Sequence, residues 1–66
     1  MNRYFELGIY NGEKSDGSGV CGKYNSFDEA SKAIKEFTKS EDQVFIIDEL
    51  EKDGESVIQH ASWLYR

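Results

Sequence analysis

The first part of the chain alternates between apolar and polar side chains, and this pattern predicts a strand over residues 3–10. Phe5, Leu7 and Ile9 fall on one side of that strand, and Tyr4, Glu6 and Tyr10 fall on the other. A period of two residues is typical of a strand with one buried face. Residues 11–19 are rich in turn-forming side chains and predict a reversal, after which residues 20–24 form a short second strand. We therefore expect an N-terminal hairpin.

The middle of the chain has the pattern of an amphipathic helix. Ser26 and Glu29 have the spacing of a capping box, in which the serine hydroxyl accepts a hydrogen bond from the backbone N–H three residues later. Apolar residues then recur at helical spacing on one face, namely Phe27, Ala30, Ala33, Ile34 and Phe37. Acids near the start and lysines near the end complement the helix dipole. The sequence predicts a helix over about residues 27–39.

A second hairpin is predicted in the last third of the sequence. Two β-rich segments, residues 43–51 and 55–65, flank an Asp-Gly dipeptide at residues 53–54. Asp-Gly between apolar segments favours a two-residue type I′ turn. In that register Leu50 lies opposite Val57, and apolar side chains face each other along both strands.

Together these elements predict one α+β domain over residues 1–66, with the order β-β-α-β-β and a four-stranded antiparallel sheet. The helix is about 20 Å long, so we expect it to pack on one face of the sheet, against Phe5, Leu7 and Ile9. The other face then meets solvent or a partner. For the second hairpin, two sets of residues remain open as the uncovered face: Phe45, Ile47, Ile58, His60 and Leu64, or Val44, Ile46, Ala61, Trp63 and Tyr65.

Negative charge is concentrated in one part of the chain. The net charge is −5, and residues 41–55 hold seven acidic side chains against Lys52 alone. A local negative field attracts basic partners. The alternative interpretation is that these acids protect an edge strand from aggregation.

The composition also bears on the compartment. Cys21 is the only cysteine, so no intramolecular disulfide can form. The sequence has no stretch of about 18 apolar residues that could span a bilayer, and residues 1–4 do not begin a secretory signal. We expect a cytoplasmic protein with no membrane partner.

Three patterns with chemical meaning lack the context that their chemistry needs. Residues 17–22 read G-x-G-x-x-G, but a dinucleotide site needs these glycines between a strand and a helix. Residues 48–55 alternate acids as a calcium loop does, without its final glutamate or its flanking helices. His60 and Cys21 are too few for a metal site, and they form a nucleophile only if they meet in space. We expect no enzyme activity, no cofactor and no metal.

The remaining features favour a non-enzymatic interaction module. We expect a small homodimeric regulator or inhibitor that occupies a surface of a larger, basic protein, such as a nucleic-acid-binding protein or a viral or host defence factor, as viral accessory proteins of this size do. The residues expected to bind the partner are Tyr4, Tyr10, Glu49, Glu51, Asp53, Glu55, Trp63 and Tyr65. The alternative is binding of RNA or single-stranded nucleic acid on an aromatic open face of the sheet, which the negative charge disfavours.

Overall fold

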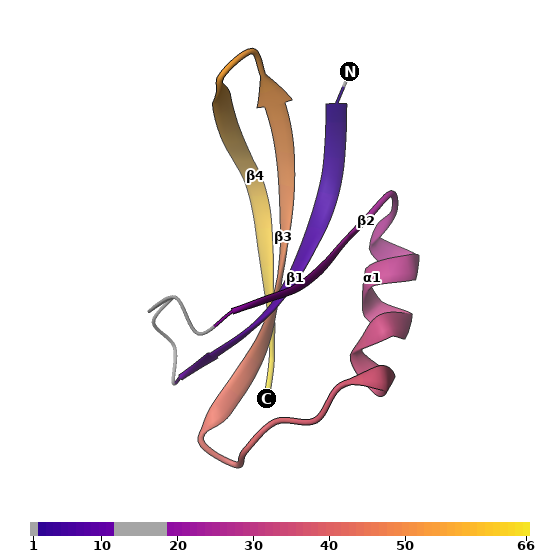
Figure 1. The fold of residues 1–66 in the computed structure, drawn as a ribbon, viewed down its shortest axis with the longest axis vertical. Helices are drawn as coiled ribbons and strands as arrows, with labels where there is room; N and C mark the ends of the chain where they lie inside the picture. The colour runs from indigo at the N-terminus through magenta and orange to yellow at the C-terminus, as the bar shows by residue number, and fades with distance from the viewer. Residues whose placement is uncertain (1, 12–18) are drawn as a thin grey trace.

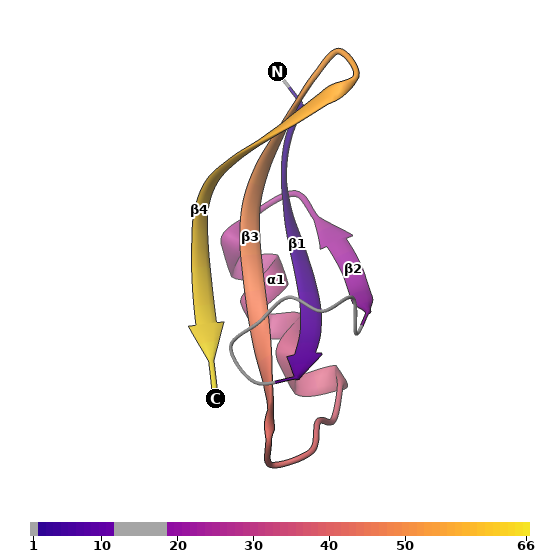
Figure 2. The same cartoon turned by 90° about the vertical axis from the view of Figure 1, so that its left-hand side faces the viewer.

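The computed structural model describes residues 2–11 and 19–66. Its elements are β1 (Asn2–Asn11), β2 (Val20–Tyr24), α1 (Phe27–Ala33), the 3-10 turn η1 (Ile34–Glu36), β3 (Gln43–Asp53) and β4 (Ser56–Tyr65). The strands form one antiparallel sheet in the order β2-β1-β3-β4, and α1 lies on one side of it (Figures 1 and 2). The predicted α+β class, with four antiparallel strands and one helix, is confirmed. Of the predicted turn over residues 11–19, residues 12–18 lie outside the described residues.

Helix α1 begins where the capping box predicts. The Ser26 hydroxyl accepts a hydrogen bond from the backbone N–H of Glu29 at 3.1 Å, and the Glu29 carboxylate accepts one from the residue before the cap at 3.2 Å. The predicted end near residue 39 is wrong, because α1 ends at Ala33 and Phe37 is extended, with φ −122° and ψ 153°. Phe37 packs against the core from that extended segment. Its apolar spacing therefore indicated a half-buried side chain and not a further helical turn.

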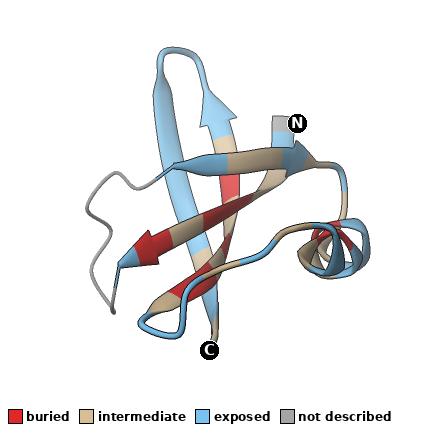
Figure 3. Cartoon of the chain, turned by 60° about the horizontal axis from the view of Figure 1, so that its bottom comes forward, coloured by how far each residue is buried: buried red, intermediate tan, exposed pale blue. Residues whose placement is uncertain are grey.

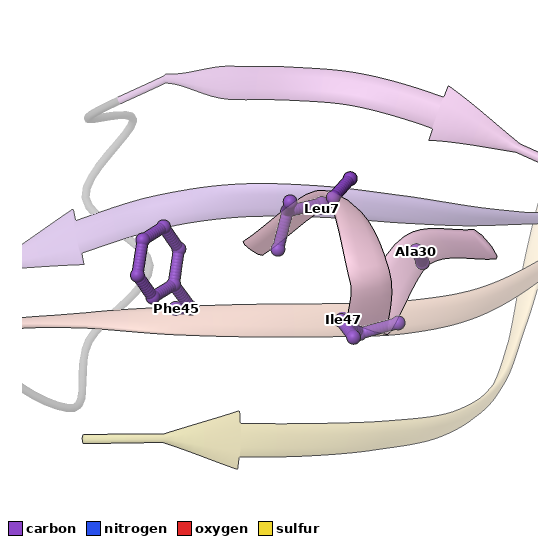
Figure 4. Close-up of a cluster of buried hydrophobic side chains, with 5 residues drawn as sticks. Leu7, Ala30, Phe45 and Ile47 are labelled. Atoms are coloured by element: carbon purple, nitrogen blue, oxygen red, sulfur yellow. The ribbon is translucent and has the colours of Figure 1, made fainter. Parts of the chain in front are cut away.

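The core lies between α1 and the two central strands. Its buried residues are Leu7, Ala30, Ala33, Phe45 and Ile47 (Figure 4). Leu7 of β1 and Ile47 of β3 are register partners, and both are fully buried. The two alanines leave room for α1 to approach the sheet closely. Phe5 and Ile9 extend the same cluster along β1.

The turn between β3 and β4 differs from the predicted one. Asp53 pairs with Ser56, so the two turn residues are Gly54 and Glu55, where residues 53–54 were expected. Gly54 has φ +65°, whereas Glu55 does not have a positive φ. A glycine with positive φ at the first central position is typical of a type II′ turn. The sequence signal located the hairpin correctly but shifted its turn by one residue.

A β-bulge in β4 changes the pairing a second time. Leu50 pairs with Gln59, but the neighbouring Glu49 pairs with Ala61, so His60 is an extra residue in β4. Because side chains alternate along a strand, an extra residue moves every later side chain to the opposite face. The pairing beyond the bulge is therefore out of phase with the predicted register.

Neither predicted set of uncovered residues is correct, because the bulge mixes the two sets. Ile47 pairs with Trp63, and Phe45 pairs with Tyr65. Tyr65 packs against the core and Trp63 against a helix residue, so these pairs lie on the helix side of the sheet. Alternation and register place the following residues on the opposite side, which we call the open face: Tyr4, Glu6, Gly8, Tyr10, Val44, Ile46, Asp48, Leu50, Lys52, Val57, Gln59, Ser62 and Leu64.

Candidate interaction surfaces

The turn end of the β3–β4 hairpin projects beyond α1 and β2 (Figure 1). We call residues 50–59 the distal arm. In the sheet, the start of β1 runs beside it, with Asn2 opposite Lys52 and Tyr4 opposite Leu50. Every residue from Lys52 to Gln59 is exposed (Figure 3), whereas Leu50 is buried. The arm is therefore a thin, solvated extension of a sheet whose other end is backed by the helix.

Arg3 ties the base of the arm to β1. Its Nη1 lies 3.0 Å from Glu49 Oε2, and its Nη2 lies 3.4 Å from Glu51 Oε1. The carboxylate side chains are only 18% and 21% exposed, while the Arg3 side chain is 41% exposed. Two of the four acids expected to bind a partner are thus engaged within the chain. Sequence reasoning missed Arg3, although its odd position puts it on the same face as Phe5.

His60 completes this cluster from the bulge in β4. Its Nε2 lies 2.7 Å from Glu51 Oε1 and 3.3 Å from Arg3 Nη2. A guanidinium group can only donate and a carboxylate can only accept, so one ring nitrogen cannot serve both. The shorter contact assigns the Nε2 proton to a hydrogen bond that His60 donates to Glu51. Hydrogen bonds from His60 and Arg3 hold the pKa of the Glu51 carboxyl below its ordinary value.

The other two predicted acids lie at the tip of the arm. Asp53 and Glu55 flank Gly54, and both side chains are exposed. They carry the outward negative charge of the arm, because Glu49 and Glu51 already face a cation. Of the four acids predicted to bind a partner, only Asp53 and Glu55 are therefore exposed.

Among the described residues, most of the exposed large apolar side chains lie on β4. Val57, Ile58, Trp63 and Leu64 are 54%, 43%, 36% and 42% exposed, and Val20 on β2 is the fifth such residue. β4 is a ten-residue edge strand, and α1 contacts β1, β2 and β3 (Figure 2). An exposed edge strand with apolar side chains is a template for pairing with another chain. The sequence did not single out Val57, and it placed Ile58 and Leu64 only in one of the two alternative uncovered sets, because which strands form the edges depends on strand order.

Trp63 packs against two phenylalanine rings on the helix side. Its ring centroid lies 4.7 Å from that of Phe27 and 6.3 Å from that of Phe5. Phe5 and Phe27 contact each other edge to face at 6.2 Å. Because these contacts already fix the orientation of the indole ring, the Trp63 side chain loses little conformational entropy on binding.

The four aromatic residues predicted as one anchor do not share a surface. Trp63 and Tyr65 lie on the helix side, whereas Tyr4 and Tyr10 lie on the open face. Tyr10 is only 7% exposed, and its ring lies over Gly8, where an added Cβ would be 2.7 Å from the Tyr10 hydroxyl. Tyr10 is therefore not available as an exposed anchor. Tyr65 is half-buried against the core.

The centre of the open face is acidic. Glu6 and Asp48 are register partners, and Asp48 Oδ1 accepts a hydrogen bond from the Ser62 hydroxyl at 2.8 Å. Beside them, Lys23 Nζ lies 5.5 Å from the centre of the Tyr4 ring. Single-strand binding on a sheet needs aromatic platforms with cations nearby to neutralise phosphate. Two central carboxylates weigh against that use of this face.

The sheet separates the two residues considered as a nucleophilic pair. Cys21 is on β2 and His60 is on β4, at opposite edges. Desolvation raises the pKa of the Cys21 thiol, which favours its unreactive form. Within residues 2–11 and 19–66, no three His, Cys, Asp or Glu side chains are grouped to hold a metal ion. Residues 17–18 of the glycine pattern lie outside the described residues, and the others belong to the β1–β2 hairpin.

A shallow groove of about 400 Å³ lies between β2 and α1. It is lined by Lys23, Tyr24, Asn25, Glu29, Lys32, Ala33 and Glu36. Its two lysines and two glutamates balance in charge, so the groove does not favour an ion of either sign.

Comparison of the chain with protein-family models, with curated proteins and with solved structures gave no match. Among the described residues, no helix combines the length and the apolar character needed to cross a bilayer.

Proposed function

We propose that this chain is a small, non-enzymatic interaction module that binds a basic surface of a larger protein through its distal arm. Its action is that of a regulator or inhibitor, which works by occupying the surface it binds. The partner remains a basic protein, as expected from the sequence, and Asp53 and Glu55 keep their predicted role. The apolar contact is made by Val57 and Ile58 of β4 instead of the predicted aromatic anchor.

The observation that carries the proposal is the exposure of the arm. Asp53 and Glu55 are at its tip, and Val57 and Ile58 follow on β4 with about half of each side chain exposed. Val57 belongs to the open face and Ile58 to the helix side, so the arm offers apolar contact on both sides. In a specific interface, charged side chains steer the approach of the partner, and apolar side chains lose their water when the two surfaces meet.

The base of the arm prepares it for binding. The ion pairs of Arg3 and the hydrogen bond of His60 cross from β1 and β4 to β3, so all three strands are joined where the arm leaves the core. An arm held in one orientation loses less conformational entropy when it binds than a flexible loop does. This cluster is therefore given a positioning role, and the contact with the partner is made by the tip.

Affinity capture from the source cells with paired charge-reversal variants tests the proposal. The test variant is Asp53→Lys/Glu55→Lys, and the matched control is Glu41→Lys/Asp42→Lys, which makes the same charge change at two exposed acids before β3. We expect the wild type and the control to retain the same basic protein and the test variant to lose it. Equal retention or equal loss by the two variants would contradict the proposal, because it would show that the arm has no special part in binding.

A separate binding experiment checks the nucleic-acid alternative. Titration of the wild type and of the Tyr4→Ala variant with single-stranded RNA shows whether the open face binds RNA. Salt-sensitive binding that depends on Tyr4, together with no effect of the arm variant, would replace the proposed function with this alternative.

A further inference from the structure

The end of β4 beyond the bulge, residues 61–65, is an unprotected strand edge. Natural edge strands are usually protected by lysine, proline or other charged residues. Between Ser56 and Tyr65, β4 contains no such residue, and His60 is its only titratable side chain apart from the terminal tyrosine. Within the part of the chain that the structure describes, β4 pairs with β3 on one side and with no strand on the other.

We propose that this edge binds a second copy of the chain. The two β4 strands pair antiparallel across a two-fold axis that passes beside Trp63, which joins the two sheets into one of eight strands. The axis runs perpendicular to the sheet, so both α1 helices lie on the same side. This proposal uses the end of β4 nearest the core and is independent of the partner proposed for the distal arm.

The bulge selects the register. A two-fold axis at the middle of β4 would fall at His60, where the extra residue interrupts regular pairing. The continuous segment is residues 61–65, and its central residue is Trp63. An isologous pair around that residue places Trp63 opposite the partner's Trp63 and Ala61 opposite the partner's Tyr65.

Side-chain sizes fit this register. On the helix side, the small Ala61 side chain lies opposite the large Tyr65 side chain of the partner. On the open face, Ser62 lies opposite the partner's Leu64, so the exposed leucine covers a small residue. Cross-strand aromatic pairs on one face stabilise antiparallel strands. Trp63 is already held against Phe27 and Phe5, so it loses little freedom on pairing.

Charge also permits pairing in this register, although each chain carries −5. Glu55 is eight residues from Trp63, so the two acidic tips point in opposite directions and lie about 50 Å apart, at about 3.3 Å per residue. That distance is several times the screening length of about 8 Å at physiological salt. Arg66 comes beside the partner's His60, at the edge of the cluster that contains Glu49 and Glu51.

The proposed pairing of the two β4 strands buries little surface area, so we expect weak association. Pairing of five residues buries well below the roughly 800 Å² per partner of a standard interface. We expect a dimer with a dissociation constant in the micromolar to millimolar range, formed in a concentration-dependent way.

Sedimentation equilibrium from about 1 µM to about 1 mM protein tests the dimer, because this range spans weak association. Leu64→Lys places a charge on the proposed edge, and Val57→Lys places the same charge on the same face of β4 in the distal arm. Both positions are exposed, so neither change opens the core. We expect Leu64→Lys to raise the dissociation constant at least tenfold and Val57→Lys to leave it unchanged.

Isotope-filtered NOEs in a dimer of mixed labelled and unlabelled chains test the register. Ala61 and Tyr65 lie about 13 Å apart along one strand, so a contact between the Ala61 methyl group and a Tyr65 ring arises only between chains. A monomer at every concentration, a dimer unaffected by Leu64→Lys, or cross-chain contacts not centred on Trp63 would overturn the proposal. Loss of the dimer alone leaves the arm's capture of its partner intact, so the two proposals fail separately.

Discussion

The two ends of the β3–β4 hairpin belong to the same pair of strands but are stabilised in different ways. At the end near the core, Phe45 and Ile47 are buried under α1, and Trp63 packs on the helix. In the distal arm, the strands have no helix against them and are joined to β1 by an arginine, two glutamates and a histidine. Apolar burial thus gives way to charged contacts at the bulge.

This difference shows how a chain of 66 residues can extend a sheet beyond its core. A domain of this size has little apolar surface to bury, and its helix covers only part of the sheet (Figure 3). Ion pairs between partly exposed side chains stabilise weakly, but they orient the strands that they join. The arm therefore keeps a defined direction while its outer side chains remain accessible to a partner.

The largest expected effect is at the core end. Ile47→Ala removes a fully buried side chain and leaves a cavity beside Leu7, so we expect a loss of about 3 kcal/mol in the free energy of unfolding. Such a loss is a large part of the stability of so small a domain. Urea denaturation followed by tryptophan fluorescence measures it.

Ile58→Ala makes the same chemical change in the distal arm and is the matched control. Ile58 is 43% exposed, so its truncation leaves no closed cavity and should cost less than about 1 kcal/mol. Similar losses for Ile47→Ala and Ile58→Ala would contradict the comparison of the two ends.

The next effect concerns the turn of the arm. Gly54 has φ +65°, and an alanine there would be strained although nothing lies within 4 Å of an added Cβ. We expect Gly54→Ala to destabilise by about 1 kcal/mol, with the loss confined to the arm. Hydrogen exchange should show faster exchange in residues 50–59 and unchanged protection around Ile47, whereas uniform acceleration would mean that the arm and core unfold as one unit.

A smaller effect is expected at the base of the arm. Arg3→Met keeps much of the side-chain length and removes the ion pairs with Glu49 and Glu51. Exposed pairs of this kind contribute little, so we expect a fall in Tm of less than about 4 °C. The difference from wild type should shrink at 1 M NaCl, where the screening length is about 3 Å. A difference that persists in high salt would assign the role of Arg3 to packing.

The smallest effect is the pH dependence of the same cluster. The folded-state pKa of Glu51 lies below its unfolded value, because His60 and Arg3 donate hydrogen bonds to the carboxylate. Its contribution to stability is therefore present above the ordinary glutamate pKa of about 4.3 and lost as the pH falls through the lower folded pKa. Thermal melting of Glu51→Gln and wild type should differ at neutral pH and converge in acid. A constant difference across that window would rule out this linkage.

The sequence predicts the positions of the strands and the helix well, but it predicts the pairing register of β3 and β4 poorly. Alternation along residues 3–10 identified β1 and its buried side, and Ser26 marked the start of α1, because these signals are local. The turn at Gly54 and the bulge at His60 depend on which of several close registers packs best in three dimensions. A glycine next to an aspartate fits two turns, and no residue type specifies a bulge.

The predicted partner-binding residues illustrate the same limit. Asp53 and Glu55 are exposed as expected for the tip of a hairpin. The engagement of Glu49 and Glu51 could not be predicted, because Arg3 reaches them only through the pairing of β1 with β3 across more than forty residues. The position of β4 at an edge of the sheet could not be predicted for the same reason, since it follows from the strand order β2-β1-β3-β4.

The single extra residue at position 60 sets which face of the sheet each side chain at the C-terminal end of β4 occupies. Deleting His60 would remove the bulge and leave Gln59 and Ala61 adjacent, each with its present partner in β3, so Trp63 and Tyr65 would stay on the helix side. A β4 strand that kept His60 but lost the bulge would instead turn Trp63 toward the open face. The bulge therefore lets β4 lose one residue before Trp63 without moving the aromatic side chains to the other face of the sheet.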